Sequence, residues 1–337
     1  LHIINLGSNG EGIGRIDGYT LFVRGAIPGD HIKAKVVKTK KNYGFGIVSD
    51  ILTPSPERVE PICPVAKQCG GCSLQHMSYE GQLKYKDSLI KDSLVRIGGV
   101  EESCVESVTE PIMGAKDPYY YRNKVQYPVR DNDGRLEIGF YAKASHRVVE
   151  TERCYIQDTY NEIIIATIKK FMISHQIRAY NEQKHKGLLR HIVIRKGATR
   201  DKFHVTLVIN GKKLPGVDII TEELMELEKV EAVSLNINRE KTNVILGHQL
   251  INLAGPNYLV DNIKDISYQI SPLSFYQINP AQTVRLYEKA LEYADLTGKE
   301  IVYDLYCGIG TISLFLAKAA KEVHGVEIVG AAIEDAR

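Results

Sequence analysis

Residues 301–329 read IVYDLYCGIGTISLFLAKAAKEVHGVEIV, and this segment predicts the fold of the C-terminal part of the chain. A short apolar run of β type ends at Asp304, and a turn that carries Gly308 and Gly310 follows. Apolar residues then recur at helical spacing, and a second β-type run over 323–326 ends at Glu327. The pattern predicts a β-α-β unit. In such units the glycines let a ligand approach the helix N-terminus, and the acid binds ribose hydroxyls.

The turn differs from the common phosphate-binding motifs. Cys307 stands where a dinucleotide-binding turn has its first glycine, and no Lys-Ser or Lys-Thr pair follows to make a P-loop. Asp304, placed before the glycines, suits a ligand with a cationic amino-acid end better than a pyrophosphate. We therefore expect S-adenosylmethionine (SAM) rather than NAD. The alternative is a β-α-β corner with a tight turn and no ligand.

The composition is that of an ordinary globular chain. Of its 337 residues, 44% are hydrophobic and 25% are charged, which predicts two or three domains with ample core. The net charge is only +2, so nucleic-acid binding has to be argued from local clusters. No apolar run approaches the roughly 20 residues that span a bilayer, and no secretory signal is visible. We expect a cytoplasmic protein with no membrane partner and no obligate protein partner.

Residues 1–55 contain glycines that separate short β-type runs, which predicts a small β-barrel. Five lysines lie within nine residues that contain no acid, and Tyr43 and Phe45 follow them. Such a basic strand with aromatics is typical of a barrel that holds nucleic-acid backbone and stacks bases. The alternative is a solvated lysine edge that discourages strand pairing. The five are Lys33, Lys35, Lys38, Lys40 and Lys41.

Three cysteines, Cys63, Cys69 and Cys72, form a C-x5-C-x2-C cluster. A loop can aim three such thiolates at one metal centre, which then needs a fourth ligand. The spacing leaves a four-cysteine zinc site and a [4Fe–4S] cluster open, and free structural thiols are the alternative. Candidates for the fourth ligand are Cys104, Cys154 and, less plausibly, Cys307.

The middle of the chain alternates β-type runs with helical pieces, which predicts a β-rich α+β domain. Three tyrosines precede Arg122 and Lys124, a composition that can stack on and pair with single-stranded RNA or simply begin a strand. Further on, Phe275, Gln277 and Asn279 would share one side of an extended segment. Because Pro280 opens a helix, Asn279 is also a candidate cap, whereas Gln277 is expected to contact a ligand.

Together these features resemble the RNA 5-methyluridine methyltransferases, in particular the bacterial 23S ribosomal RNA (uracil-5-)-methyltransferases. The resemblance covers essentially the whole chain. It rests on the TRAM-like barrel, the cysteine block that ends Cys-Ser-Leu-Gln-His, Glu-Arg-Cys-Tyr-Ile around Cys154, Ser-Phe-Tyr-Gln-Ile-Asn, and Asp-Leu-Tyr-Cys-Gly-Ile-Gly-Thr. It implies a multidomain α/β protein. A TRAM/OB-like RNA-binding barrel (1–55) precedes an iron–sulfur central domain (56–265) and a Rossmann-like SAM methyltransferase domain (266–337).

The resemblance also implies the site residues. A [4Fe–4S] cluster would be held by Cys63, Cys69, Cys72 and Cys154, which leaves out Cys104 and Cys307. SAM would be contacted by Gln277 and Glu327, in a pocket shaped by Tyr306, Gly308 and Gly310. The RNA contacts that we expect are Lys33, Lys35, Lys38, Lys40, Arg122 and Lys124.

The family's reaction is a Michael addition. A cysteine thiolate attacks carbon 6 of uracil, carbon 5 takes the methyl group from SAM, and a base then removes the carbon 5 proton as the cysteine leaves. The family's Asp-Pro-Pro-type, Ser-Cys-Asn-type and His-x-Glu-type motifs, which carry these groups, do not occur in residues 1–337. We therefore carry over no catalytic residue, and expect an incomplete SAM domain in an inactive, C-terminally truncated fragment.

Three alternatives stay open. A transfer-RNA uracil-5 methyltransferase is a variant of the main interpretation, although those relatives generally lack the basic barrel and the cysteine cluster. A radical-SAM methylthiotransferase needs C-x3-C-x2-C, and the x5 spacing disfavours it. A non-catalytic RNA-binding protein with a purely structural cluster is the third.

Overall fold

The computed structural model describes residues 1–132 and 134–336. Contacts divide the chain into unit 1 (Leu1–Lys116 and Tyr141–His146) and unit 2 (Asp117–Phe140 and Arg147–Arg337), which are described one at a time. The three domains expected from the sequence follow other boundaries and stay a prediction. Among the described residues, no helix combines the length and the apolar character that crossing a bilayer requires.

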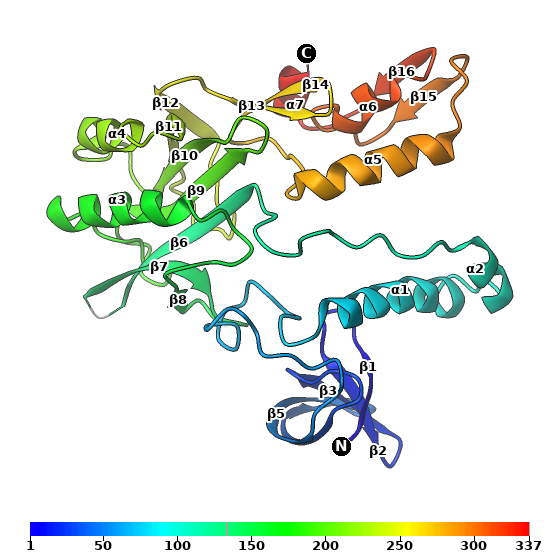
Figure 1. The fold of residues 1–337 in the computed structure, drawn as a ribbon. Helices are drawn as coiled ribbons and strands as arrows, with labels where there is room; N and C mark the ends of the chain where they lie inside the picture. Colours follow the sequence, from blue (N-terminus) through cyan, green and yellow to red (C-terminus); the bar gives the residue numbers. More distant parts are fainter. Residues whose placement is uncertain (133, 337) are drawn as a thin grey trace. The chain divides into compact units, whose positions relative to one another are not determined.

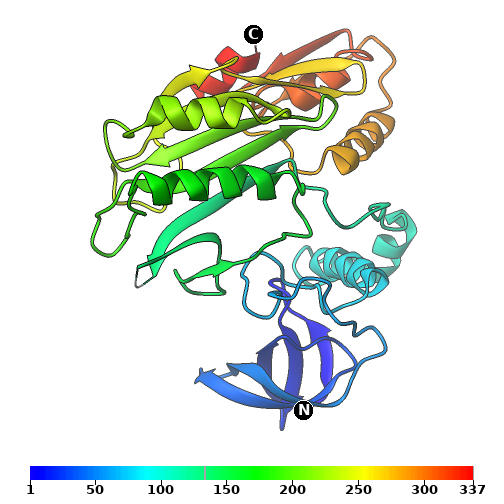
Figure 2. The same ribbon diagram turned by 60° about the vertical axis from the view of Figure 1, so that its left-hand side comes forward.

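Unit 1 begins with the small barrel that the glycine pattern predicts, drawn in blue in Figure 2. Its sheet has the order β1-β2-β3-β5-β4, and Leu1 and Ile32 exchange backbone hydrogen bonds of 2.9 Å that join its first and last strands. The interior is filled by Ile3, Leu21, Val23 and neighbouring apolar side chains. The strands are β1 (Ile3–Leu6), β2 (Gly12–Ile16), β3 (Tyr19–Arg24), β4 (His31–Thr39) and β5 (Tyr43–Thr53).

Glycine and aromatic residues alternate at the start of β5. A Cβ on Gly44 would lie 3.0 Å from the Lys38 carbonyl oxygen, and one on Gly46 would lie 3.1 Å from that of Lys35. The interior therefore has little room for side chains at these two positions. Because strand residues alternate between faces, Tyr43 and Phe45 point outward.

Asp30, which is completely buried, connects the barrel to the segment that follows β5. Its carboxylate accepts hydrogen bonds from the amides of Ile27 (2.8 Å) and Ser55 (2.9 Å) and from Arg58 Nε (2.9 Å). Burial opposes ionisation, but hydrogen bonds from Arg58, Ile27 and Ser55 outweigh it and lower the pKa of Asp30. A buried charge-assisted network thus connects the barrel to Arg58.

Two helices complete unit 1: α1 (Tyr79–Arg96) and α2 (Glu102–Val108). The Ser78 hydroxyl caps α1 by accepting the amide of Gly81 at 3.0 Å. Tyr85 on α1 donates its hydroxyl to the Gly7 carbonyl at 2.7 Å and packs in a cluster with Leu6 and Ile27. Helix α1 is therefore attached to the barrel.

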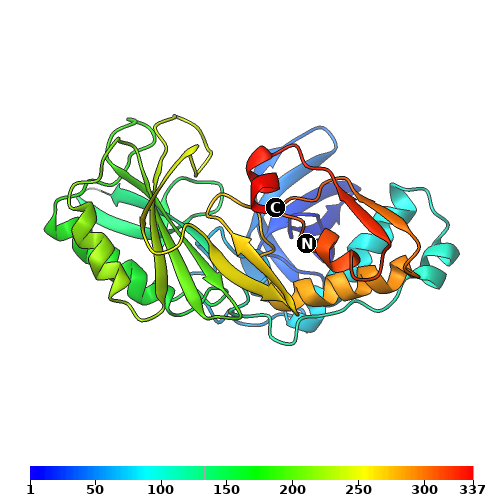
Figure 3. The ribbon, with the colours of Figure 1, turned by 90° about the horizontal axis from the view of Figure 1, so that it is seen from above.

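Unit 2 contains a seven-stranded sheet in the order β12-β11-β10-β9-β6-β7-β8. Helices α3 (Asn161–Ser174) and α4 (Val217–Met225) lie along one face of it, as Figures 1 and 3 show. The strands are β6 (Lys124–Asn132), β7 (Arg135–Tyr141), β8 (Val148–Glu150), β9 (Leu189–Gly197), β10 (Lys202–Ile209), β11 (Val230–Ile237) and β12 (Gln249–Ala254).

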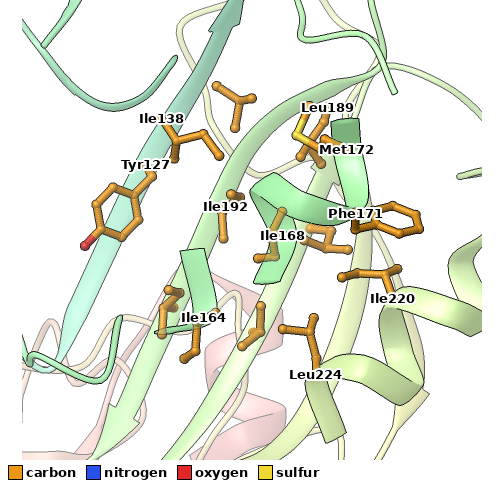
Figure 4. Packing of buried hydrophobic residues seen from close by; sticks show 14 of the residues in the cluster. Tyr127, Ile138, Ile164, Ile168, Phe171, Met172, Leu189, Ile192, Ile220 and Leu224 are labelled. Atoms are coloured by element: carbon orange, nitrogen blue, oxygen red, sulfur yellow. The ribbon is translucent and has the colours of Figure 1, made fainter. Parts of the chain in front are cut away.

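The main core fills the space between these helices and the sheet (Figure 4). On α3 the buried residues Ile164, Ile168, Phe171 and Met172 recur every three or four positions, which gives the helix one apolar stripe. They pack against the sheet, where the central strand β9 contributes residues such as Ile192. The amphipathic pattern in the sequence thus becomes the helix-on-sheet layer.

The C-terminal part of unit 2 contains the expected β-α-β unit. Strands β15 (Ile301–Asp304) and β16 (Glu322–Gly325) pair in parallel, with α6 (Thr311–Leu316) between them. The helix is shorter than the apolar run that predicts it, because residues 317–321 form a turn leading into β16. The other elements are β13 (Leu259–Ile263), β14 (Ile266–Ile270), α5 (Pro280–Ala294) and α7 (Gly330–Ala336).

Candidate functional site

The turn after β15 is held by the chain that leaves β16. The Val326 amide donates to the Asp304 carbonyl at 2.8 Å, and the Cys307 amide donates to the Val326 carbonyl at 3.1 Å. Gly308 (φ +55°) and Gly310 (φ +75°) have left-handed backbone conformations, and no atom lies within 4 Å of a Cβ placed on Gly308. Glycine is thus required by the backbone at both positions, and the side of the turn at Gly308 is open.

Glu327 connects the two strand ends. Its carboxylate accepts the Gly308 amide at 3.0 Å and the Val329 amide at 2.8 Å. The Val329 amide most of all lowers the pKa of Glu327; burial opposes this, and the amides of Gly308 and Ile328 add to the lowering. An ionised carboxylate has about four acceptor positions, so Glu327 keeps capacity to accept hydrogen bonds from ligand hydroxyls.

Asp304 organises the start of the turn. One carboxylate oxygen accepts the Ser313 hydroxyl at 2.6 Å, and the other accepts the Tyr306 amide at 3.3 Å. The Tyr306 side chain is 92% exposed, which is unusual for an aromatic residue. The turn therefore presents a free aromatic ring beside the glycines.

Cys307 is buried in the same turn, and its sulfur lies 2.9 Å from where a Cβ on Gly325 would be. Burial, followed by the negative charges of Asp304 and Glu327, raises the pKa of the Cys307 thiol. A protonated thiol in this confined position is a poor nucleophile. That Cys307 belongs to the cofactor loop and is not the nucleophile stays a prediction.

Gln277 reaches the turn through a chain of hydrogen bonds. Its side chain bonds to the Tyr287 hydroxyl, and that hydroxyl lies 2.7 Å from the Thr311 hydroxyl at the start of α6. Its backbone carbonyl accepts the Asn123 side-chain amide at 2.9 Å. Nothing in the sequence singles out Tyr287, because its role depends on α5 folding against residues far away in the chain.

The segment 271–279 is a loop and not an extended strand. The Asn279 side chain accepts the Gln282 amide at 3.1 Å and so caps α5, the second of the two roles that the sequence allows. Phe275 is 70% exposed. The idea that Phe275, Gln277 and Asn279 form one ligand-gripping side of a strand is therefore wrong for Asn279, whose side-chain oxygen serves the helix.

The cysteine cluster lies in unit 1, except for Cys154. Cys69 Sγ accepts the Gly71 amide, and Cys72 Sγ accepts the Gln75 side-chain amide, both at 3.3 Å. Burial raises the pKa of both thiols, and the charge of Cys63 raises each further, so the three sulfurs share one electrostatic environment. Burial makes the thiols of Cys69 and Cys72 resist ionisation when alone, and a positively charged metal centre would offset that cost.

The fourth expected ligand, Cys154, belongs to unit 2, where its charge contributes to raising the pKa of the buried Tyr127. Cys104 is exposed on α2. Across residues 1–132 and 134–336, no three or more His, Cys, Asp or Glu side chains are arranged to hold a metal ion. The donor chemistry thus fits a metal, but the described positions do not form a closed site.

The basic residues that the sequence singles out lie in both units. Four of the lysines have exposed side chains: Lys33, Lys35 and Lys38 on β4, and Lys40 in the turn to β5. Within the described residues, none of their ammonium groups forms a salt bridge. The Tyr19 hydroxyl donates to the Lys40 carbonyl at 2.9 Å and so pins this turn.

In unit 2, Lys124 lies half-buried at the start of β6. Burial, followed by the charges of Arg195 and Arg122, lowers the pKa of Lys124 to about 8. Arg195 itself is completely buried and donates to the Ser274 carbonyl at 2.6 Å. The sequence did not single out Arg195, which stands in a β-type run that predicts only a strand. Together with Arg122, these side chains form a basic cluster at one end of the sheet.

Comparison with known proteins gives consistent results. Residues 2–49 match the family model of the TRAM domain, and residues 78–337 match that of tRNA (Uracil-5-)-methyltransferase. An uncharacterized RNA methyltransferase of Clostridium tetani is 46% identical over 338 residues, covering 100% of this chain and 72% of that protein. One of Halalkalibacterium halodurans is 47% identical over 336 residues, covering 99% of this chain and 72% of that protein.

Among solved structures, the chain is similar to the Pyrococcus abyssi tRNA (uracil-54, C5)-methyltransferase in complex with S-adenosyl-L-homocysteine. The TM-score is 0.78 at 27% identity, and the match covers 100% of this chain and 74% of that one. The similarity therefore includes the barrel, the cysteine loop and the β-α-β unit.

Proposed function

Because this chain belongs to the tRNA (uracil-5-)-methyltransferase family of SAM-dependent RNA methyltransferases, we propose that it forms 5-methyluridine in 23S ribosomal RNA. The observation that supports SAM binding is the turn after β15. There the amides of Gly308 and Val329 donate to the Glu327 carboxylate and hold it ionised. An acid in this position binds ribose hydroxyls.

Five residues would bind SAM. Glu327 accepts the ribose hydroxyls, and the open backbone at Gly308 and Gly310 admits the cofactor close to the turn. The exposed ring of Tyr306 would shape the cofactor pocket, and Gln277, whose side chain bonds to the Tyr287 hydroxyl, would contact the cofactor. The methyl donor would thus be held between the β-α-β unit and the loop before α5.

RNA would be bound by lysines of β4 and by the basic cluster of unit 2. The exposed ammonium groups of β4 suit phosphates, because neutralising phosphates supplies most of the affinity of such proteins. The residues proposed are Lys33, Lys35, Lys38, Lys40, Arg122 and Lys124. The proposal assigns residues 1–337 to binding SAM and RNA and names no nucleophile or base among them. It keeps the division into domains at 1–55, 56–265 and 266–337.

The proposal includes a [4Fe–4S] cluster bound by Cys63, Cys69, Cys72 and Cys154. Such a centre would neutralise the thiolates. It suits a cytoplasmic protein, where thiols are kept reduced. We expect protein purified without oxygen to contain iron and acid-labile sulfide. Cys63→Ser should lose both and Cys104→Ser should keep both; equal content in the two variants would contradict this ligand set.

A transfer-RNA substrate is the second candidate. The structure of an enzyme named for tRNA uracil 54 matches this chain over its whole length, so the barrel and the cysteine loop do not distinguish the two substrates. The two RNAs therefore have to be compared directly.

The test uses the native-length protein purified without oxygen, together with SAM and unmodified 23S RNA or tRNA that carries tritium at carbon 5 of uridine. Methylation at carbon 5 releases that tritium to water. Release from 23S RNA that depends on SAM supports the proposal, and release from tRNA alone replaces it by the second candidate. No release from either RNA, by protein that binds SAM, would overturn uracil methylation.

A further inference from the structure

The barrel of unit 1 has an open pocket of about 480 Å³ on its outer surface. Three aromatic side chains and one carboxylate line it, together with two amides. We propose that this pocket binds one unpaired guanine of the RNA and so reads a base away from the methylated uracil. The inference rests on the proposed function only in taking RNA as the partner. The residues that matter are Asn9, Glu11, Phe22, Asn42, Tyr43 and Phe45.

The aromatic rings form a cluster that belongs to the surface and not to the barrel core. Phe22 on β3 stands opposite Phe45 on β5, with ring centroids 5.7 Å apart. Tyr43 meets both rings edge to face, at 5.9 Å from Phe22 and 5.6 Å from Phe45. The inward glycines at 44 and 46 direct these rings outward. Exposed clustered aromatics are the platform on which proteins stack unpaired bases.

Glu11 supplies the polar group of the pocket. A Cβ on Gly7 would lie 3.3 Å from Glu11 Oε2 and 3.4 Å from Phe22 Cδ1, so the carboxylate and the ring flank the same point. In the part of the chain that the structure describes, this carboxylate receives no hydrogen bond and forms no ion pair. Its loop is nevertheless fixed, because the Gly7 amide donates to the Glu11 carbonyl at 2.7 Å and Tyr85 holds the Gly7 carbonyl.

The chemistry of a carboxylate selects guanine. A carboxylate only accepts hydrogen bonds and takes two donors side by side. Guanine alone among the four bases presents two adjacent donors, N1–H and the N2 amino group, on its Watson–Crick edge. Uracil offers one donor between two carbonyl oxygens, and adenine and cytosine offer an amino group beside an acceptor nitrogen that a carboxylate repels. The amides of Asn9 and Asn42 add donors suited to the guanine carbonyl.

The charges around the pocket favour RNA over an uncharged ligand. Lys38 stands opposite Phe45 in the β4–β5 ladder, and Lys40 follows in the turn that leads to Tyr43. A base stacked on these rings would have its phosphates close to exposed ammonium groups that pair with no acid among the described residues. Stacking, a directional acceptor and cations thus occur together at one site.

The test measures binding of residues 1–337 to short labelled RNAs by fluorescence anisotropy at one fixed salt concentration. We expect a uridine oligonucleotide with one central guanosine to bind about tenfold more tightly than one of uridine alone. Replacing the guanosine by inosine, which lacks the N2 amino group, should remove most of that preference. Glu11→Gln should abolish it, so that the two oligonucleotides bind equally tightly.

Two further variants distinguish recognition of guanine from RNA binding that does not depend on the base. Asp17→Asn removes an exposed carboxylate from the β2–β3 turn of the same barrel and should keep the full guanine preference. Tyr43→Leu should weaken both oligonucleotides by roughly tenfold, because stacking does not depend on the base. Equal affinity of the unaltered protein for the two RNAs, or a preference that survives Glu11→Gln, overturns the guanine pocket. The tritium assay tests uracil methylation separately and is unaffected by either result.

Discussion

At the residue scale, the function depends on side chains whose charge state is fixed by backbone amides or by burial. Glu327 is kept ionised by the amides of the turn that it closes, with no cation beside it in the described residues. A ligand hydroxyl therefore meets a negatively charged acceptor whose position is already set. Cys307, one turn away, is kept protonated by burial.

Glu327→Gln should weaken the binding of S-adenosyl-L-homocysteine by roughly tenfold or more, since hydrogen bonds to charged groups are the stronger ones. The variant keeps the size of the side chain and loses one acceptor and the charge. Calorimetric titration measures the effect. Glu322→Gln is the control, because that side chain at the start of β16 pairs with His324 and is exposed. Equal affinity in the two variants would rule out Glu327 as the ribose-binding acid.

His204 should make unit 2 sensitive to acid. It is buried, its Nε2 lies 2.7 Å from the Ser234 hydroxyl, and burial followed by the charge of Arg195 lowers the pKa of His204 to about 4 from an ordinary 6.5. Between pH 6.5 and 4 the unfolded chain takes up a proton that the folded chain does not. The free energy of unfolding therefore falls as the pH falls through this window, by roughly 3 kcal/mol in all.

Urea unfolding at the two ends of that window measures this loss. His204→Gln should reduce the loss, and His248→Gln, at an exposed position, should leave it unchanged. Some acid sensitivity should persist in both variants, because burial also lowers the pKa of His191, to about 3. An undiminished loss in His204→Gln would show that His204 titrates normally.

At the element scale, patterns with local causes were predictable. The sequence predicted the β-α-β order at 301–329 and the small barrel in residues 1–55, because spacing and glycine turns determine them locally. It missed the hydrogen bond between Tyr287 and Thr311 and the presence of Glu11 and Phe22 in one pocket, which only the folded chain brings about. The apolar run after Gly310 also overstated α6, since helical spacing does not show where the chain turns back to β16.

The start of α5 shows how an element supports the site. Asn279→Ala should lower the free energy of unfolding of unit 2 by about 1 kcal/mol, because the Gln282 amide loses its cap. Asn279→Ser should recover most of that loss, since a serine hydroxyl caps equally well. Thermal or urea unfolding followed by circular dichroism distinguishes the two. Identical stability of the alanine and serine variants would mean that the cap contributes nothing.

At the scale of the whole molecule, the chain has two compact units, and proteins of this kind do not unfold in one step. S-adenosyl-L-homocysteine should raise the midpoint of the unit 2 transition and leave that of unit 1 in place. A ligand at 100 times its Kd stabilises the unit that binds it by about 2.7 kcal/mol. Scanning calorimetry detects the shift.

Two variants assign and check that result. Asp30→Asn lowers the unit 1 transition and so identifies it, because Arg58 loses its buried partner. Glu327→Gln should reduce the shift of unit 2 at the same ligand concentration. A shift of both transitions together would show that the units unfold as one.

The buried pair of Asp30 and Arg58 also determines where the barrel segment can end when it is fused to another protein. The matched TRAM segment stops at residue 49 and the last strand at Thr53, but the guanidinium that neutralises the barrel's own carboxylate comes later. A barrel segment that ends at residue 49 or residue 53 would lack Arg58 and leave the buried Asp30 carboxylate unpaired. This would lower the free energy of unfolding by about 3–5 kcal/mol. The smallest barrel segment that can be transferred intact therefore includes Arg58. We expect fusion proteins whose barrel segment ends before Arg58 to be insoluble, and those whose segment includes Arg58 to be soluble.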